Sequence, residues 1–262
     1  MSEVFYQGIR DLRTGKIVAL SRPLPLAEWP FKISEPDGLL WRYGDYWKFK
    51  ALLESRQLYF RRADKLEDIK EGRFTEANRA GPSRLFAGAF ADLKLGDPAQ
   101  ILKIQESHRV RTFLSCWHKN PQENPRMWPA YTETPESIVI AVRTQNLLTE
   151  MAGRCQAFDV QYISEDEALP ELQSLAVFAY KRSEPFAFEQ EFRLAYMLPQ
   201  EESIYLDQAQ DFGRTLPADP AKLVQEIRFH PRATMVFKAQ VRSDLKAAGF
   251  SVNARDSETT VT

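Results

Sequence analysis

Two glutamates and an arginine at alternate positions form the first group whose chemistry can be inferred from the sequence. Glu189, Glu191 and Arg193 occupy every second position of one run, and Lys181 precedes them. Alternate side chains of a β-strand share a face, which would bring the two carboxylates within about 7 Å of each other. Like charges that close raise the pKa of one group or attract a cation or a polar substrate. A glutamate–arginine ladder on a solvated sheet face is the structural alternative.

A hydroxyl, an imidazole and several aromatic rings crowd into a second group. Its members are Ser115, Trp117, His118, Trp128 and Tyr131. Aromatic side chains on a proline-rich loop beside a strand end often line a ligand pocket. The alternative is a hydrophobic plug, with His118 at the surface. Strand alternation directs Cys116 away from Ser115 and Trp117, which favours a buried core thiol over a nucleophile.

A guanidinium within an aromatic run marks a third group. Arg42 lies between Trp41 and Tyr43, and strand alternation directs its side chain away from theirs. Burying a guanidinium without a partner is costly, so Arg42 should face water, a carboxylate or an anionic ligand. An ion pair of Arg42 with Asp68 or Glu71 is the structural alternative.

Strands and helices must position these groups, and the hydrophobic pattern predicts both. Apolar runs and period-two alternation predict strands, whereas capping residues followed by helical periodicity predict helices. The predicted strands span 39–43, 57–61, 111–117, 137–142, 157–163, 187–198, 224–229 and 250–254. The predicted helices span 45–56, 84–95, 98–109, 145–152, 165–180 and 233–248. We therefore expect an α+β (mixed α/β) fold, with a curved mixed β-sheet core and peripheral helices.

Composition limits the classes of function. The 262 residues carry 35 Lys and Arg against 36 Asp and Glu, a formal net charge of −1. This balance provides no global positive field of the kind that nucleic-acid scaffolds carry. The two cysteines have no metal-ligand spacing, and no metal site is predicted. The sequence shows neither a signal-peptide core nor the about 20 apolar residues of a membrane span, so we expect a cytoplasmic protein without membrane association.

One domain is expected between two less regular ends. Prolines interrupt the first segment, which predicts an N-terminal arm or short strand pair at 1–36. A single catalytic-type α+β domain should occupy 37–256. The small polar residues at 257–262 predict a flexible tail.

The three groups, in this order, resemble a bacterial family known as domain of unknown function 2971. The matching motifs are Trp41-Arg42-Tyr43, Leu58-Tyr59-Phe60, Asp68 with Glu71-Gly72, Ser115-Cys116-Trp117, Met127-Trp128-Pro129-Ala130-Tyr131, and Lys181 with Phe188-Glu189-Gln190-Glu191-Phe192-Arg193. The resemblance covers about residues 38–255. It departs after the second strand, where the family often has Asn-Asp-Pro-Phe-Glu and this chain has the run from Leu66 to Gly72.

A looser resemblance to ADP-ribosyltransferases supplies an expected activity. An early arginine, a middle serine and a late Glu-x-Glu imply that Arg42, Ser115 and Glu191 form the triad. The resemblance implies NAD as a consumed substrate, with Glu189 activating the acceptor and Tyr131 or Trp128 stacking on the ring. A carboxylate opposes the positive charge that develops on the ribose as the glycosidic bond breaks. The other expected ligand-binding residues are Tyr43, Tyr59, Trp117, His118 and Arg193.

This interpretation implies a small-molecule nucleotide ligand and a macromolecular acceptor, protein or nucleic acid, in a toxin or phage-defence effector. Two other functions stay open. A Mg²⁺-dependent nuclease of a defence system would use Asp68, Glu71, Glu189 and Glu191. A non-catalytic module would recognise a nucleotide or a peptide through its aromatic residues. Dinucleotide-fold, Walker A, nucleophile-elbow and zincin signatures are absent from the sequence.

Overall fold

The fold was obtained as a computed structural model. It describes residues 8–10, 17–19, 31–80, 98–169, 175–199, 202, 205–207 and 209–260. The predicted helix at 84–95 and most of the predicted N-terminal arm lie outside these residues. Within the arm, β1 (Gly8–Arg10) and β2 (Ile17–Ala19) pair antiparallel with each other. No helix among the described residues is long and apolar enough to cross a membrane.

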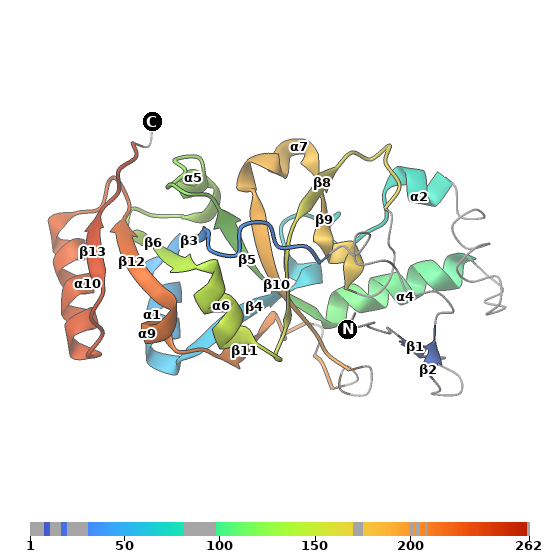
Figure 1. The fold of residues 1–262 in the computed structure, drawn as a ribbon, viewed down its shortest axis with the longest axis horizontal. Coiled ribbons are helices and arrows are strands. Elements are labelled where there is room, and N and C mark those ends of the chain that lie inside the picture. Colours follow the sequence, from blue (N-terminus) through green and yellow to red (C-terminus); the bar gives the residue numbers. More distant parts are fainter. Residues whose placement is uncertain are drawn as a thin grey trace.

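A nine-stranded mixed sheet organises the described part of the chain (Figure 1). Its main path runs β11-β4-β5-β3-β6-β12-β13, while β10 pairs with β5 and β7 pairs with β10. The strands are β3 (Leu39–Asp45), β4 (Gln57–Arg62), β5 (Thr112–Lys119), β6 (Ser137–Arg143), β7 (Gln156–Asp159), β10 (Glu191–Met197), β11 (Gly213–Pro217), β12 (Val224–Phe229) and β13 (Asn253–Asp256). Only β12 and β13 pair parallel in this sheet, and its other pairs are antiparallel.

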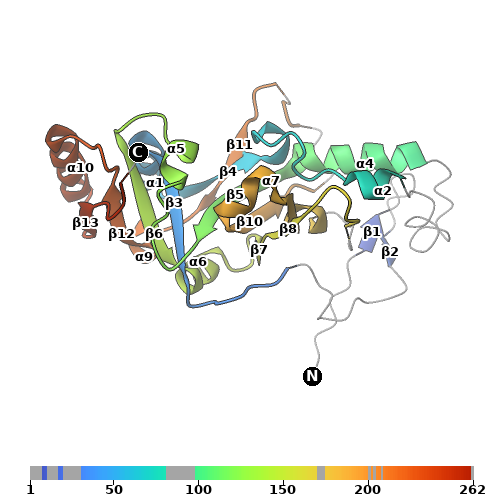
Figure 2. The same cartoon turned by 90° about the horizontal axis from the view of Figure 1, so that it is seen from above.

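Helices lie around this sheet, as expected for the mixed α/β class, and that prediction is confirmed. They are α1 (Tyr46–Ser55), α2 (Glu76–Ala80), α4 (Pro98–Arg111), α5 (Met127–Tyr131), α6 (Thr144–Met151), α7 (Ser183–Phe186), α9 (Pro220–Leu223) and α10 (Met235–Ala247). Helix α10 lies at one end of the molecule, and α4 and α2 lie at the other (Figures 1 and 2). A small parallel pair, β8 (Gln161–Ile163) and β9 (Tyr180–Arg182), completes the regular structure.

The sheet forks at β5. One edge of β5 pairs with β10 from His118 opposite Glu191 to Thr112 opposite Met197. The other edge pairs with β3 near His118 and with β4 near Leu114. Strands β3 and β4 therefore leave the same edge at different points and diverge, which gives the sheet its curvature (Figure 2).

Each face of the sheet buries a separate hydrophobic core. Phe113, Trp117 and Leu194 belong to the larger core, which α1, α6 and α10 cover. On the other face, Leu114 packs in a second core, and a third core lies under α5, with Trp41 among its members. Because neighbours on a strand alternate between faces, β5 contributes Phe113 and Leu114 to different cores.

Two predicted elements near the first group are wrong. The described residues of 165–180 contain a 3₁₀ turn, Ala176–Ala179, that leads into β9 and buries Phe178 in the second core. The Ser164 N–H still donates to the Glu167 carboxylate at 3.1 Å, so the capping contact forms without the expected helix. The strand predicted at 187–198 begins only at Glu191, because residues Ala187–Glu189 form a 3₁₀ turn.

Two smaller differences concern loops and strand ends. The proline-rich loop expected to carry the aromatic residues of the second group contains the short helix α5. The strand predicted at 157–163 divides at Val160 into β7 and β8, which belong to different sheets.

Candidate functional site

A buried chain of alternating charges crosses the face of β10. Arg193 meets Glu71 through two bonds, Nη1 to Oε1 and Nη2 to Oε2, each 2.7 Å. Its Nε donates to Glu191 Oε2 at 2.5 Å. The Lys181 ammonium then bonds both Glu191 Oε1 and Glu189 Oε2, each at 2.5 Å. Each of the five residues is at most 6% exposed, so these charges compensate one another away from bulk water.

Two left-handed backbone positions assemble this chain of charges. Gly72, with φ +66°, follows Glu71 in the turn that delivers the carboxylate to Arg193. Gln190, with φ 42°, separates Glu189 from the start of β10. The two glutamates therefore do not stand side by side on one strand face, as the sequence suggested. Both instead approach Lys181, with their bonded oxygens within about 5 Å of each other.

The two carboxylates differ in their affinity for protons. Burial, together with the neighbouring Glu191, raises the pKa of Glu189 to about 7. Burial alone would also raise the pKa of Glu191, but Arg193 and Lys181 outweigh it and hold that pKa well below the usual value. Near neutral pH the site thus contains one fixed anion and one carboxyl that exchanges its proton. Environments that push two pKa values apart are typical of acid–base pairs in enzymes.

An imidazole and a phenol contact the same glutamate. The Tyr131 hydroxyl donates to Glu189 Oε1 at 2.6 Å, and His118 Nδ1 lies 2.6 Å from the Glu189 carbonyl oxygen. A carbonyl oxygen only accepts, so Nδ1 carries the proton. Burial lowers the pKa of His118, which favours the neutral ring. Its Nε2 is therefore a buried acceptor, and none of the residues that the structure describes forms a hydrogen bond with it.

Most of the aromatic residues expected to bind a ligand are buried in a hydrophobic core. The Trp128 and Tyr43 rings pack edge to face with centroids 5.0 Å apart, and they are 0% and 7% exposed. The expected stacking of a ligand on Trp128 is therefore wrong, and the expected ligand-binding residues Tyr43 and Trp117, the latter 2% exposed, are buried as well. Tyr131 is 36% exposed and keeps an accessible ring beside Glu189.

The predicted triad does not converge. Ser115 lies opposite Leu194 in the β5–β10 register, whereas Glu191 lies opposite His118. Because paired residues share a face and neighbours alternate, Ser115 and Glu191 point to opposite faces of the sheet. Ser115 is 1% exposed, and its hydroxyl accepts a bond from the Trp117 indole N–H at 3.2 Å.

Arg42 belongs to the face of Ser115 and Trp117, close to the fork. Its guanidinium lies 5.4 Å from the Trp117 ring centroid and donates to the Tyr59 carbonyl at 3.2 Å. Among the described residues no carboxylate pairs with it, and burial lowers its pKa. The structural alternative, an ion pair of Arg42 with Asp68 or Glu71, does not form among the described residues, and Arg193 takes the Glu71 carboxylate. The ring of Tyr59 is 42% exposed on β4.

Cys116 lies on the face of the charged chain and is half-buried. Burial, reinforced by the Glu191 charge, raises its pKa far above the usual value. The thiol therefore stays protonated and is a poor nucleophile, as the sequence indicated.

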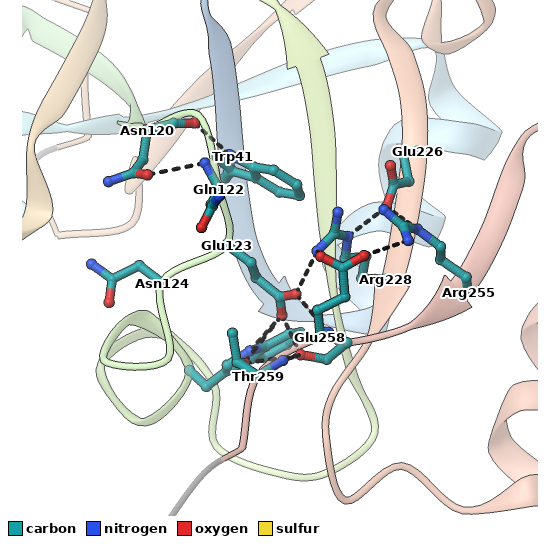
Figure 3. A network of polar contacts seen from close by, with 12 residues as sticks. Trp41, Asn120, Gln122, Glu123, Asn124, Glu226, Arg228, Arg255, Glu258 and Thr259 are labelled. Carbon is teal, nitrogen blue, oxygen red and sulfur yellow. Dashed lines mark hydrogen bonds and ion pairs between the residues drawn. The ribbon is translucent and has the colours of Figure 1, made fainter.

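A second polar network, centred on Glu123, was not predicted from the sequence (Figure 3). Glu123 accepts from the Trp128 indole N–H at 3.0 Å and from Arg228 Nη1 at 2.9 Å. Arg228 also lies 4.9 Å from the Trp41 ring centroid and bonds Glu226 and Glu258. These residues are far apart in the chain and match no short motif. The one signal in the sequence is that Glu123 lies between two prolines, which indicates a loop.

Metal-ligand geometry is absent from the described part of the chain. No group of three or more His, Cys, Asp or Glu side chains there is arranged to hold a metal ion. The carboxylates named for a nuclease are already engaged, since Glu71, Glu189 and Glu191 are each bonded to a cationic side chain. Two surface hollows of about 230 and 490 Å³ lie elsewhere, one beside Met151 and Cys155 and one beside Phe250.

Comparison with known proteins adds no assignment. No model of a protein family matches the chain, and no curated protein matches it. The resemblances described from the sequence therefore stay predictions, and the chemistry of the site has to be argued from its own geometry.

Proposed function

We propose that the chain is an NAD-consuming, ADP-ribosyltransferase-like enzyme whose reacting carboxyl is Glu189. The observation that carries the proposal is the Lys181-bridged pair, in which Glu189 has a pKa of about 7 and Glu191 stays ionised. Glu189 keeps the acceptor-activating role that the resemblance implied, whereas Glu191 acts as a fixed negative charge, because Arg193 and Lys181 hold it.

The pair supplies what transfer from an N-glycoside requires. When the bond between the ribose C1′ and the nicotinamide nitrogen breaks, the bonding electrons leave with nicotinamide and positive charge develops on the ribose. Negative charge from Glu189 and Glu191 opposes that charge. The acceptor's nucleophilic atom then bonds to C1′, and its proton passes to Glu189. A carboxyl with a pKa near neutrality is suited to that proton transfer.

The test measures nicotinamide release and transfer of labelled ADP-ribose in cell lysate. Glu189→Gln keeps the shape of the side chain but removes its charge, and we expect a rate loss of at least about 100-fold. Glu136→Gln, at an exposed position, is the matched control. Release by wild type that equals release by Glu189→Gln would end the proposal. Magnesium-dependent cutting of DNA or RNA would favour the nuclease instead.

A non-catalytic nucleotide- or peptide-binding module is the second candidate. It is favoured by one observation, the nearly complete burial of the charged chain, in which every carboxylate already has a cationic partner. On this alternative, Glu189→Gln leaves ligand affinity unchanged, while removal of the exposed Tyr131 ring weakens binding. Isothermal titration with NAD on both variants separates the two candidates.

A toxin or phage-defence role and a macromolecular acceptor follow from the same proposal. Expression of wild type and Glu189→Gln in a bacterial host tests the first, by comparing growth. Mass spectrometry of protein and nucleic acid from those cells identifies the second.

A further inference from the structure

The residues after β13 bind the body of the protein. Ser257 donates its hydroxyl to Glu123, and the Glu258 backbone N–H donates to the same carboxylate at 3.1 Å. The Thr259 hydroxyl approaches Glu123 at 3.5 Å, and its N–H donates to Ser257 at 3.0 Å. Figure 3 shows Glu258 and Thr259 beside Glu123. Residues 257–259, which belong to the predicted flexible tail at 257–262, thus contact the body of the protein, and we call them the strap.

Hydrogen bonds and ion pairs attach the strap, and its release would leave the core in place. Its residues are half-buried or exposed, and the Glu258 side chain is 60% exposed. Without the strap, Glu123 would keep its bonds to Arg228 and to the Trp128 indole N–H, so no buried charge would be left unpaired.

Glu123 connects the strap to the carboxyl proposed as the reacting group. Its Oε1 receives the indole N–H of Trp128, which belongs to α5. One turn later in the same helix, Tyr131 donates to Glu189 Oε1, while Lys181 holds Oε2. Both oxygens of Glu189 are therefore bonded within the protein. A ligand that takes the place of Tyr131 at Oε1 needs the Tyr131 hydroxyl to withdraw, which a shift of α5 would allow.

We propose that the strap is an autoinhibitory element that holds α5, and with it Tyr131, over Glu189. Release of the strap removes two of the bonds that fix Glu123, so that Glu123 and the Trp128 indole bonded to it can shift together, which loosens α5 and frees Oε1 for a ligand. The regulatory part rests on the proposed function, whereas the mechanical part, restraint of α5 by the strap, does not. Each part is tested by its own measurement.

The mechanical part is tested by hydrogen exchange on two truncated chains. Deletion of residues 257–262 removes the strap, whereas deletion of residues 260–262 leaves it intact and is the matched control. We expect the amides of 127–131 to exchange at least about fivefold faster in the first chain and unchanged in the second. Equal exchange in both chains would overturn the proposal, whatever the activity.

The regulatory part is tested by nicotinamide release from the same chains. We expect the strap deletion to raise the rate at least about threefold, since Tyr131 no longer holds Glu189 Oε1. A lower rate, with α5 loosened and the fold intact by circular dichroism, would overturn the inhibitory role. Faster exchange with no turnover in any chain would support the mechanical part and remove the proposed function.

Because truncation can disturb β13, a full-length variant provides a second test. The double substitution Ser257→Ala with Thr259→Ala removes both hydroxyls, and Thr260→Ala, at an exposed neighbouring position, is its control. The double variant should reproduce the faster exchange of 127–131 to a smaller extent, because the Glu258 backbone bond remains. Exchange identical to the control would contradict the strap.

Discussion

Arg193 and Glu71 meet through two parallel N–H···O bonds of 2.7 Å, with both side chains 1% exposed. They are 122 positions apart in the chain, so this contact ties the turn before Gly72 to the middle of the sheet. The pair also orders the site, because the same guanidinium bonds Glu191.

Loss of one partner from this pair should destabilise the protein strongly. Glu71→Ala leaves a buried guanidinium with one carboxylate fewer, and we expect the free energy of unfolding to fall by about 3–5 kcal/mol. Urea denaturation followed by circular dichroism measures the change. Glu67→Ala, on the exposed part of the same turn, should cost under about 0.5 kcal/mol. Equal effects of the two substitutions would show that the buried pair is not stabilising.

The pH dependence of stability should carry the signature of Glu189. Its folded pKa of about 7 lies above the ordinary value of 4.5, so the folded state binds this proton more tightly than the unfolded chain. The stabilising contribution is complete below pH 4.5 and is lost as the pH rises through about 7. Glu189→Gln should remove this decline between those two pH values. Urea midpoints measured across that range, compared with Glu136→Gln, test the prediction, and parallel curves for all three proteins would refute it.

The state of His118 should not change across the physiological pH range. Burial lowers its pKa, and the bond to the Glu189 carbonyl fixes the proton on Nδ1. Nitrogen-detected NMR should show a neutral ring with a protonated Nδ1 from pH 7 to 8. His118→Asn retains a donor near Nδ1 but deletes the Nε2 acceptor, so it should fold and yet bind NAD more weakly. A titrating ring, or unaltered NAD binding by the folded variant, would contradict this view of Nε2.

Two glycines with similar backbone angles should respond differently to alanine. Gly72 and Gly153 have φ of +66° and +73°, but an added Cβ at Gly72 would lie 2.3 Å from the Phe178 ring, whereas nothing lies within 4 Å at Gly153. Gly153→Ala should therefore cost only the backbone strain, about 1 kcal/mol. Gly72→Ala adds a clash in a packed core, and we expect a loss of about 3 kcal/mol or more. Thermal unfolding of both variants measures the difference, which disappears if the turn relaxes away from Phe178.

The strands were predictable where the pattern was local. The apolar run beginning at Ser137 indicated a central strand, and β6 lies between β3 and β12. Proline at position 98 indicated a helix start, and α4 begins there. The predicted helix at 165–180 failed because its capping contact, although formed, cannot outweigh the burial of Phe178.

The sequence identified most residues of the site, but it did not predict how their side chains are arranged. Glu189, Glu191, Arg193, His118 and Tyr131 do gather on one face. Ser115 does not, because its face relative to Glu191 depends on the register between β5 and β10. That register is set by long-range packing, and a slip of one residue would have reversed it. The left-handed Gln190 likewise has no reliable local signal.

The divergence of β3 and β4 from one edge of β5 leaves a line along β5 at which the sheet can bend. The β5–β10 ladder is continuous on one side of it, whereas β3 and β4 each hold β5 by a short stretch of pairing. A movement of β3 relative to β4 would strain these two short pairings first and leave the longer β5–β10 pairing intact. The distance between the Arg42 guanidinium on β3 and the Tyr59 carbonyl on β4 would then report how far the two strands have moved apart.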